Sequence, residues 1–143
     1  SESKIEEILR TYGFDLITSH EKQQVEQIKI AVIELIHQLN NVDSIVRKSD
    51  YLVEKLGKSY QYLSKVFSSN EGITLEKFII FQKIERIKEL IYQDEYTLSE
   101  IAYMMDYSSV QYLSNQFKKI TGLSVTEFRK NEYPLKKSID QLY

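Results

Sequence analysis

The chain contains an internal repeat with a period of about 50 residues, and this repeat limits the folds that are open to it. Seven of the eighteen residues in segment 61–78 recur unchanged in segment 111–128. The identical pairs are Gln61/Gln111, Tyr62/Tyr112, Leu63/Leu113, Ser64/Ser114, Phe67/Phe117, Gly72/Gly122 and Phe78/Phe128. Upstream the offset falls to 49, so we expect one extra residue in the second copy, just before Tyr112. The repeat predicts that one supersecondary unit occurs twice.

The first copy predicts a short helix, a tight turn and a second helix. We expect the first helix over residues 51–56 and the turn at Gly57, because glycine adopts positive φ without steric cost. Ser59 predicts an N-cap, since its hydroxyl can accept from a free N–H of the first turn, for a helix that runs through Phe67. This order of elements is that of a helix-turn-helix.

The second copy predicts the same order of elements. Thr97 and Glu100 predict a capping box at the start of its first helix. Asp106 takes the turn position, because Asp tolerates the left-handed conformation better than most residues. Ser108 with Gln111 predicts a second capping box, which opens a helix to about residue 119. We also expect Val53 and Ala102 to lie at equivalent close crossings of two helices.

A long helix over residues 74–91 is expected to join the two copies. Its predicted core stripe consists of Phe78, Phe81, Ile84, Ile87, Leu90 and Ile91. At ~1.5 Å per residue this helix is a rod of about 27 Å, so the two second helices would lie roughly 34 Å apart, one turn of B-DNA. A capping box at Ser124 predicts a last helix that ends near Lys130.

The outer faces predicted for the two second helices are polar and carry no acidic residue. The candidate DNA-binding residues on these faces are Tyr60, Gln61, Ser64, Lys65, Ser109, Val110, Gln111, Ser114, Asn115, Lys118 and Lys119. Amides, hydroxyls and lysines suit base edges and phosphates, whereas a carboxylate would be repelled by DNA. We therefore expect recognition helices at about 60–68 and 109–119, which would enter successive major grooves of double-stranded DNA.

The first 40 residues predict a different kind of structure. We expect a short helix ended by Gly13, a strand-like run over residues 14–17, and a long helix from Ser19. The long helix would bury a stripe made of Val25, Ile28, Val32, Leu35, Ile36 and Leu39. Ile30 and Ile33 lie off this stripe, so the helix needs a second partner, either residues 1–18 or a second chain. Residue 1 is Ser rather than Met, so we expect a processed, tagged or truncated chain.

Composition excludes several other classes of function. The chain has no Cys and two His, which excludes disulfides, thiolate zinc sites and most imidazole-based catalysis. The sequence contains no nucleophile–base pair, no phosphate-binding Gly loop and no definable carboxylate pair, so we expect no enzyme activity, no cofactor and no metal. The net charge is −2, but residues 41–143 carry net +1. No apolar run is long enough to span a membrane, and we expect a cytoplasmic location.

Several side chains have a structural interpretation beside a functional one. Glu34 and His37 form a single Glu-x-x-His pair where a di-iron bundle needs two, so we expect His37 to be a partly buried structural residue. Tyr62, Tyr107 and Tyr112 fall at motif core positions, so packing is favoured over stacking on single-stranded bases. Tyr60 is instead expected to reach a phosphate.

Over residues ~22–131 the sequence resembles the DNA-binding domain of AraC-type bacterial transcription regulators. The resemblance is most specific in segment 101–129, which has Ile-Ala, an aromatic residue before Ser, Tyr-Leu, Phe-Lys-Lys, Gly and Phe-Arg in the family's order. It implies seven helices and base contacts from Gln61, Ser64, Lys65, Val110, Gln111, Ser114 and Asn115. The chain departs from the family at Asp106, where Gly is frequent, and at Val125, where Pro is. It also has Lys65, Lys83 and Asn115 where the family often has Arg, so fewer bidentate guanine contacts are expected.

These observations predict an all-α main domain and two hypotheses for its function. Residues 1–20 would be the remnant of a small α/β domain or a linker, 21–131 the double helix-turn-helix domain, and 132–143 a tail. The first hypothesis is a sequence-specific double-stranded DNA-binding transcription regulator. RNA polymerase and a second copy of the chain, through its N-terminal region, are candidate further partners. The alternative is a protein-interaction module of the same fold, with weak or lost DNA binding and helix 21–39 as its docking face.

Overall fold

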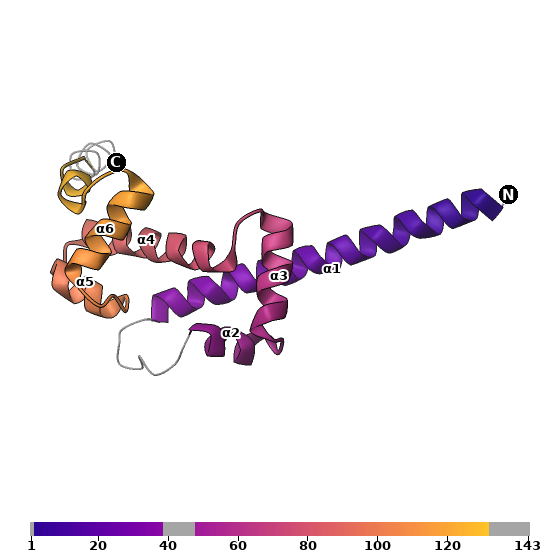
Figure 1. The fold of residues 1–143 in the computed structure, drawn as a ribbon, viewed down its shortest axis with the longest axis horizontal. Helices are drawn as coiled ribbons and strands as arrows, with labels where there is room; N and C mark the ends of the chain where they lie inside the picture. The colour runs from indigo at the N-terminus through magenta and orange to yellow at the C-terminus, as the bar shows by residue number, and fades with distance from the viewer. Residues whose placement is uncertain (1, 39–47, 132–143) are drawn as a thin grey trace, which may run out of the picture. The chain divides into compact units, whose positions relative to one another are not determined.

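The regular structure of the chain is helical wherever the structure describes it. The computed structural model describes residues 2–38 and 48–131, with side chains from residue 19 onward. The helices are α1 (Glu2–Gln38), α2 (Lys48–Leu56), α3 (Tyr60–Glu71), α4 (Leu75–Gln93), α5 (Leu98–Met104) and α6 (Val110–Thr121), and residues 125–131 are also helical (Figure 1). The expected all-α fold of seven helices is confirmed for these residues. None of the described helices combines the length and apolar character needed to cross a membrane.

The chain forms two compact units, and each contains one helix-turn-helix. The first unit holds α2, α3 and α1 as far as Glu34, and the second holds α5, α6 and α4 from Ile79 onward. Within each unit the short helix packs against the capped helix that follows it, α2 on α3 and α5 on α6. The sequence repeat therefore corresponds to a repeated three-dimensional unit.

The N-terminal part of the chain differs from the prediction. Helix α1 is continuous from Glu2 to Gln38, so the expected stop at Gly13, the strand at residues 14–17 and the cap at Ser19 are wrong (Figure 1). A glycine inside a helix costs only about 1 kcal/mol. An isolated four-residue strand would leave its backbone N–H and C=O groups without a ladder, whereas a helix pairs them internally. The role of residues 1–20 as a domain remnant or linker stays a prediction.

The packed face of α1 agrees with the predicted stripe. Val25, Ile28, Val32, Leu35 and Ile36 are all buried, while Leu39 lies outside the described residues. The off-stripe residues are exposed, Ile30 at 55% and Ile33 at 40%. His37 is also exposed, so the expectation of a partly buried structural histidine is wrong. Its position follows from the helical period, because His37 comes one residue after the buried Ile36 and points about 100° away from it.

Each motif is built around one fully buried phenylalanine. Phe67 and Phe117 have no exposed surface, and the residues Leu63 and Leu113, four positions earlier, are equally buried. The ring centroid of Phe67 lies 5.0 Å from that of Phe78. The corresponding distance between Phe117 and Phe128 is 5.5 Å. The repeated aromatic pairs thus contribute to the core of each unit, with Phe67 and Phe117 as the fully buried members.

Two predicted core positions are on the surface. Phe81 is 36% exposed, whereas its helical neighbours Ile79 and Lys83 are buried. Phe81 follows Ile79 by two residues, which turns it about 200° around α4 and away from the buried face. Val53 is 37% exposed and Ala102 only 3%, so the expected close helix crossing has a buried small residue in the second motif alone.

Candidate nucleic-acid interface

The first motif presents α3 through a glycine turn and a serine cap. Helix α2 ends at Leu56, and Gly57 adopts a φ of 69° while its N–H donates to the carbonyl of Val53. The Ser59 hydroxyl accepts from the N–H of Tyr62 at 3.2 Å, which confirms the predicted N-cap. The helix continues to Glu71, four residues past the predicted end, and stops where Gly72 takes a φ of 75°.

The second motif makes the same turn with different residues. Thr97 and Glu100 form the predicted capping box, with both N···O distances 3.1 Å. Asp106 adopts a φ of 61°, as expected for the turn position. The cap of α6 is Ser109 and not Ser108, because the Ser109 hydroxyl accepts from the N–H of Tyr112 at 3.0 Å.

The corrected cap relocates the extra residue of the second copy. Ser59 and Ser109 each cap the N–H three residues ahead, so the offset of 50 already holds at the caps. The interval from the positive-φ residue to the cap is two residues in the first motif, from Gly57, and three in the second, from Asp106. The extra residue therefore lies in the turn, where it does not disturb either helix.

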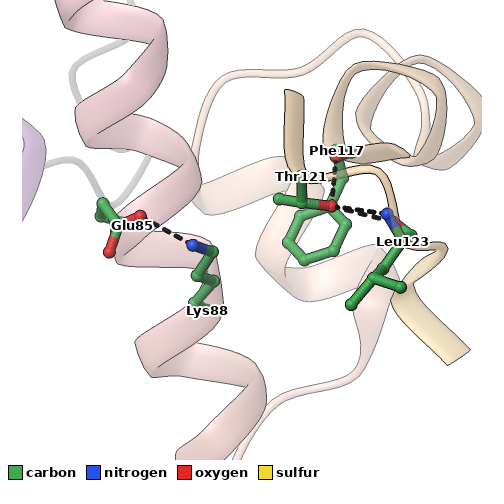
Figure 2. Close-up of polar contacts among 5 residues, drawn as sticks. All are labelled: Glu85, Lys88, Phe117, Thr121 and Leu123. Carbon is green, nitrogen blue, oxygen red and sulfur yellow. Dashed lines mark hydrogen bonds and ion pairs between the residues drawn. The ribbon is translucent and has the colours of Figure 1, made fainter. Parts of the chain in front are cut away.

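The C-terminal end of α6 is fixed by Thr121. Its hydroxyl donates to the carbonyl of Phe117 at 2.7 Å and accepts from the N–H of Leu123 at 3.1 Å (Figure 2). Gly122, between them, has a φ of 80°. The predicted capping box at Ser124 and Glu127 then opens the helix of residues 125–131. On α4 of the same unit, Lys88 pairs with Glu85 at 2.8 Å (Figure 2).

The outer face of α3 carries four of the predicted site residues. Gln61 and Lys65 are exposed, and Ser64 and Tyr60 are half-buried. The Tyr60 hydroxyl donates to Glu76 Oε1 at 2.7 Å, at the start of α4. Burial raises the pKa of Tyr60 above its ordinary value, and the hydrogen bond to Glu76 raises it further. The Tyr60 proton is thus already bound by a carboxylate, which weakens the expectation that this hydroxyl donates to a phosphate.

The outer face of α6 carries the other seven predicted site residues. The exposed ones are Ser109, Gln111, Asn115, Lys118 and Lys119, and the half-buried ones are Val110 and Ser114. Gln111 Nε2 donates to Asn115 Oδ1 at 3.0 Å. The two lysines lie in the last turn of the helix, where a positive charge is favoured by the helix dipole. The structure therefore groups amides near the start of α6 and cations at its end.

Two tyrosines expected in the motif cores lie on the surface instead. Tyr62 is 39% exposed and Tyr112 is 56% exposed. Each precedes a buried leucine by one residue, so the helical period turns its ring toward solvent. The Lys58 ammonium lies 5.8 Å from the ring centroid of Tyr62. Their places in the motifs had predicted packing, but the exposure of both rings makes them additional candidates for the interface.

Tyr107 is the one tyrosine of the three that packs as expected. It is half-buried, its hydroxyl donates to Gln116 Oε1, and its ring centroid lies 5.7 Å from that of Tyr112. The ammonium of Lys83, a residue only 5% exposed, lies 4.6 Å from the Tyr107 ring centroid. Burial raises the pKa of Tyr107 to about 12, with a smaller contribution from Tyr112, so the ring stays neutral at physiological pH.

Polar contacts connect α1 to the first motif. Lys29 pairs with Glu71 at 3.0 Å, at the end of α3. Lys55 of α2 lies 3.3 Å from Glu34 Oε2, an atom shielded from solvent whose partner is this ammonium. The hydrogen bond from Lys29 to Glu71 is the main cause that raises the pKa of the lysine above 10.5. These pairs hold the ends of α2 and α3 on the same helix.

In the described part of the chain, no group of three or more His, Cys, Asp or Glu side chains is placed to hold a metal ion. Two capped helix-turn-helix motifs with exposed, polar second helices are the features of a DNA-binding class of protein.

Comparisons with known proteins place the chain in a family. A family model described as a helix-turn-helix domain matches residues 52–131. The xylose operon regulatory protein of Escherichia coli (strain K12) is 30% identical over 99 residues, which make up 69% of this chain and 25% of that protein. The chain thus spans about a quarter of the length of this curated relative.

Solved structures show the same fold. The C-terminal domain of AraT, a response regulator from Geobacillus stearothermophilus, is 25% identical with a TM-score of 0.57, covering 73% of this chain and 84% of that one. A Chromobacterium violaceum transcriptional regulator, described among AraC-type DNA-binding domain-containing proteins, is 15% identical with a TM-score of 0.62 and covers 78% and 94%. The chain belongs to the AraC-type helix-turn-helix family of DNA-binding transcription regulators.

Proposed function

We propose that this chain reads double-stranded DNA in a sequence-specific manner, with α3 and α6 as its two recognition helices. The observation that carries the proposal is the outer face of each helix. Both faces are exposed, both are held by a serine N-cap, and neither carries an acid over residues 60–70 or 110–121. A surface of this kind can approach the phosphate-lined major groove without charge repulsion.

The two helices would read different bases. Gln61 and Lys65 are exposed on α3, and Lys favours the O6 and N7 atoms of guanine. Gln111 and Asn115 are exposed on α6, and each amide suits N6 and N7 of adenine. Ser64, Ser114 and Val110 would add shorter contacts. The target is therefore expected to be two unlike half-sites about ten base pairs apart.

Phosphate contacts would come from cations at the edges of these faces. Lys118 and Lys119 are exposed in the last turn of α6, and Arg129 and Lys130 are exposed in the following helix. Such contacts fix the protein on the duplex without reading its sequence, and they make binding depend on salt.

A mobility-shift titration at several salt concentrations, with specific and scrambled duplexes, tests the proposal. The expected result is tighter binding to duplexes that carry the preferred half-sites, with an affinity that falls as salt rises. Equal affinity for all duplexes would contradict sequence-specific reading. Absence of binding to any duplex would favour the protein-interaction alternative.

Partners and location follow from this function as further proposals. A regulator of this kind acts where bacterial DNA lies, in the cytoplasm, and RNA polymerase and a second copy of the chain are its candidate protein partners. The family consists of transcription regulators, which supports a non-enzymatic role.

A further inference from the structure

The outer face of α6 has a feature that the outer face of α3 lacks. Gln111 and Asn115, four residues apart and both exposed, are joined by a hydrogen bond of 3.0 Å from Gln111 Nε2 to Asn115 Oδ1. At the equivalent positions of the first motif stand Gln61 and Lys65, which no hydrogen bond connects in the described structure. The second motif therefore presents two amides that are joined by a hydrogen bond.

The bond leaves a definite set of donors and acceptors for DNA. Each amide has two N–H donors and an oxygen that accepts twice. After the bond forms, Gln111 keeps one N–H and its whole oxygen, and Asn115 keeps both N–H groups and one acceptor position. An adenine edge requires one acceptor for N6–H and one donor for N7, which both residues still offer. The O6 and N7 of guanine require two donors, which Gln111 no longer has.

We propose that Gln111 and Asn115 act as one coupled reading unit for two neighbouring adenine-containing base pairs, in which each amide orients the other. The inference rests on the proposed function and specifies how its second motif reads DNA. Ordering a free, rotamer-rich side chain on binding reduces affinity by roughly twofold to tenfold, and the shared bond removes part of that loss. The bond also strengthens when the DNA excludes water from it.

A double-mutant cycle tests the coupling. The parent, Gln111→Ala, Asn115→Ala and the double variant are titrated with the duplex that the parent selects from a random pool. Each single variant is expected to bind about tenfold more weakly, and the double variant also about tenfold more weakly, because either truncation disables the unit. If Gln111 and Asn115 read DNA independently, the double variant would bind the duplex about a hundredfold more weakly than the parent. This result would overturn the inference.

Matched variants separate coupling from other effects. The double variant of Gln61→Ala and Asn115→Ala changes one residue in each motif. Its loss of DNA affinity should therefore equal the product of the two single losses. Asn115→Asp keeps the acceptor for Gln111 but has no donor. The preference at the base pair that residue 115 contacts should therefore move from adenine to cytosine, whose N4 donates. An unchanged preference would contradict the assignment. Circular dichroism melts check that the variants, all on exposed positions, remain folded.

The experiment also distinguishes this inference from the proposed function. A parent that selects no sequence from the random pool contradicts sequence-specific reading itself, and with it the coupled unit. A parent that selects a site while its two single losses multiply contradicts only the coupling.

Discussion

Among single residues, the two motifs differ most in the one that holds the positive-φ position of the turn between their helices. Gly57 and Asp106 both have positive φ, 69° and 61°. A Cβ built on Gly57 would meet no atom within 4 Å, so only the backbone conformation disfavours a side chain there. An L-residue in this conformation costs roughly 1–2 kcal/mol, somewhat less for Asp, and the second motif carries that cost.

Opposite substitutions at the two turns should therefore have opposite effects. Gly57→Ala is expected to lower the free energy of unfolding by about 1 kcal/mol, and Asp106→Gly to raise it by about 0.5 kcal/mol, after the entropy of the unfolded chain is counted. Urea titrations followed by circular dichroism measure both. Destabilisation by Asp106→Gly would show that the Asp106 side chain makes a contact which outweighs its backbone strain.

The buried phenylalanines give a second prediction for single residues. Phe67→Ala and Phe117→Ala each remove a side chain with no exposed surface, and each should cost roughly 3–5 kcal/mol of unfolding free energy. Thermal or urea unfolding measures the loss, with Phe81→Ala as the control because Phe81 is 36% exposed. A Phe117→Ala variant that unfolds like the parent would show that this ring is not the core of the second unit.

The exposed cation Lys118 gives a third prediction for single residues. If its ammonium meets a phosphate, Lys118→Ala should weaken binding to all duplexes alike and lower the slope of log affinity against log salt by about one unit. Mobility shifts at graded salt measure both effects. Lys22→Ala, an exposed lysine on α1 with the same change of charge, is the matched control and should leave the slope unchanged. Loss confined to one DNA sequence would identify Lys118 as a base reader instead.

Sequence signals that span a few residues predicted the ends of helices better than signals that depend on longer segments. The caps at Ser59, Thr97 and Ser124 follow from hydroxyls three residues before a free N–H, a local rule that the fold preserves. Ser108 failed because two adjacent serines satisfy that rule equally, and only the turn geometry selects Ser109. The helix end expected at Gly13 was wrong. A strand after Gly13 would need a partner strand, and the sequence of one segment does not reveal whether a partner exists.

Contacts between elements were not predictable from the sequence. Neither spacing nor the repeat indicates that Lys29 would pair with Glu71 of α3, or that Glu34 would meet Lys55 of α2. Such pairs join residues that are distant in sequence and depend on how α1 lies on the first motif. Both pairs join α1 to the first motif, and the residues that the two repeats share do not predict them.

The pair of Lys29 and Glu71 gives a prediction about pH. The folded pKa of Lys29 is raised above 10.5, so its stabilisation is complete below that pH and disappears as the pH rises through the folded pKa. Glu71→Gln should lower the unfolding free energy at neutral pH by up to about 1 kcal/mol, the usual limit for an exposed pair. Urea titrations at increasing pH should show parent and variant converge only above 10.5. A difference that persists in strong alkali would mean that the carboxylate acts through another contact.

For the molecule as a whole, the repeat carried most of what the sequence could reveal. It indicated two helix-turn-helix units, their buried phenylalanines and the outer faces of α3 and α6, because each depends on periodicity within one segment. It did not reveal the exposure of Tyr62 and Tyr112, since identical residues recur for surface reasons as well as for packing. The bond between Gln111 and Asn115 was equally hidden, because spacing predicts proximity but not which amide donates.

Selection of duplexes from a random pool, by the parent and by Asn115→Ala, measures whether the two recognition helices read unlike half-sites. The parent is expected to select two different half-sites about ten base pairs apart. Asn115→Ala should relax the preference at the two neighbouring base pairs that Gln111 and Asn115 read together in the half-site of α6, at a cost of ~1–3 kcal/mol on the preferred site, while non-specific binding hardly changes. Recovery of a perfect palindrome would show that α3 and α6 do not read unlike half-sites. Indistinguishable sites for the two proteins would show that Asn115 reads no base.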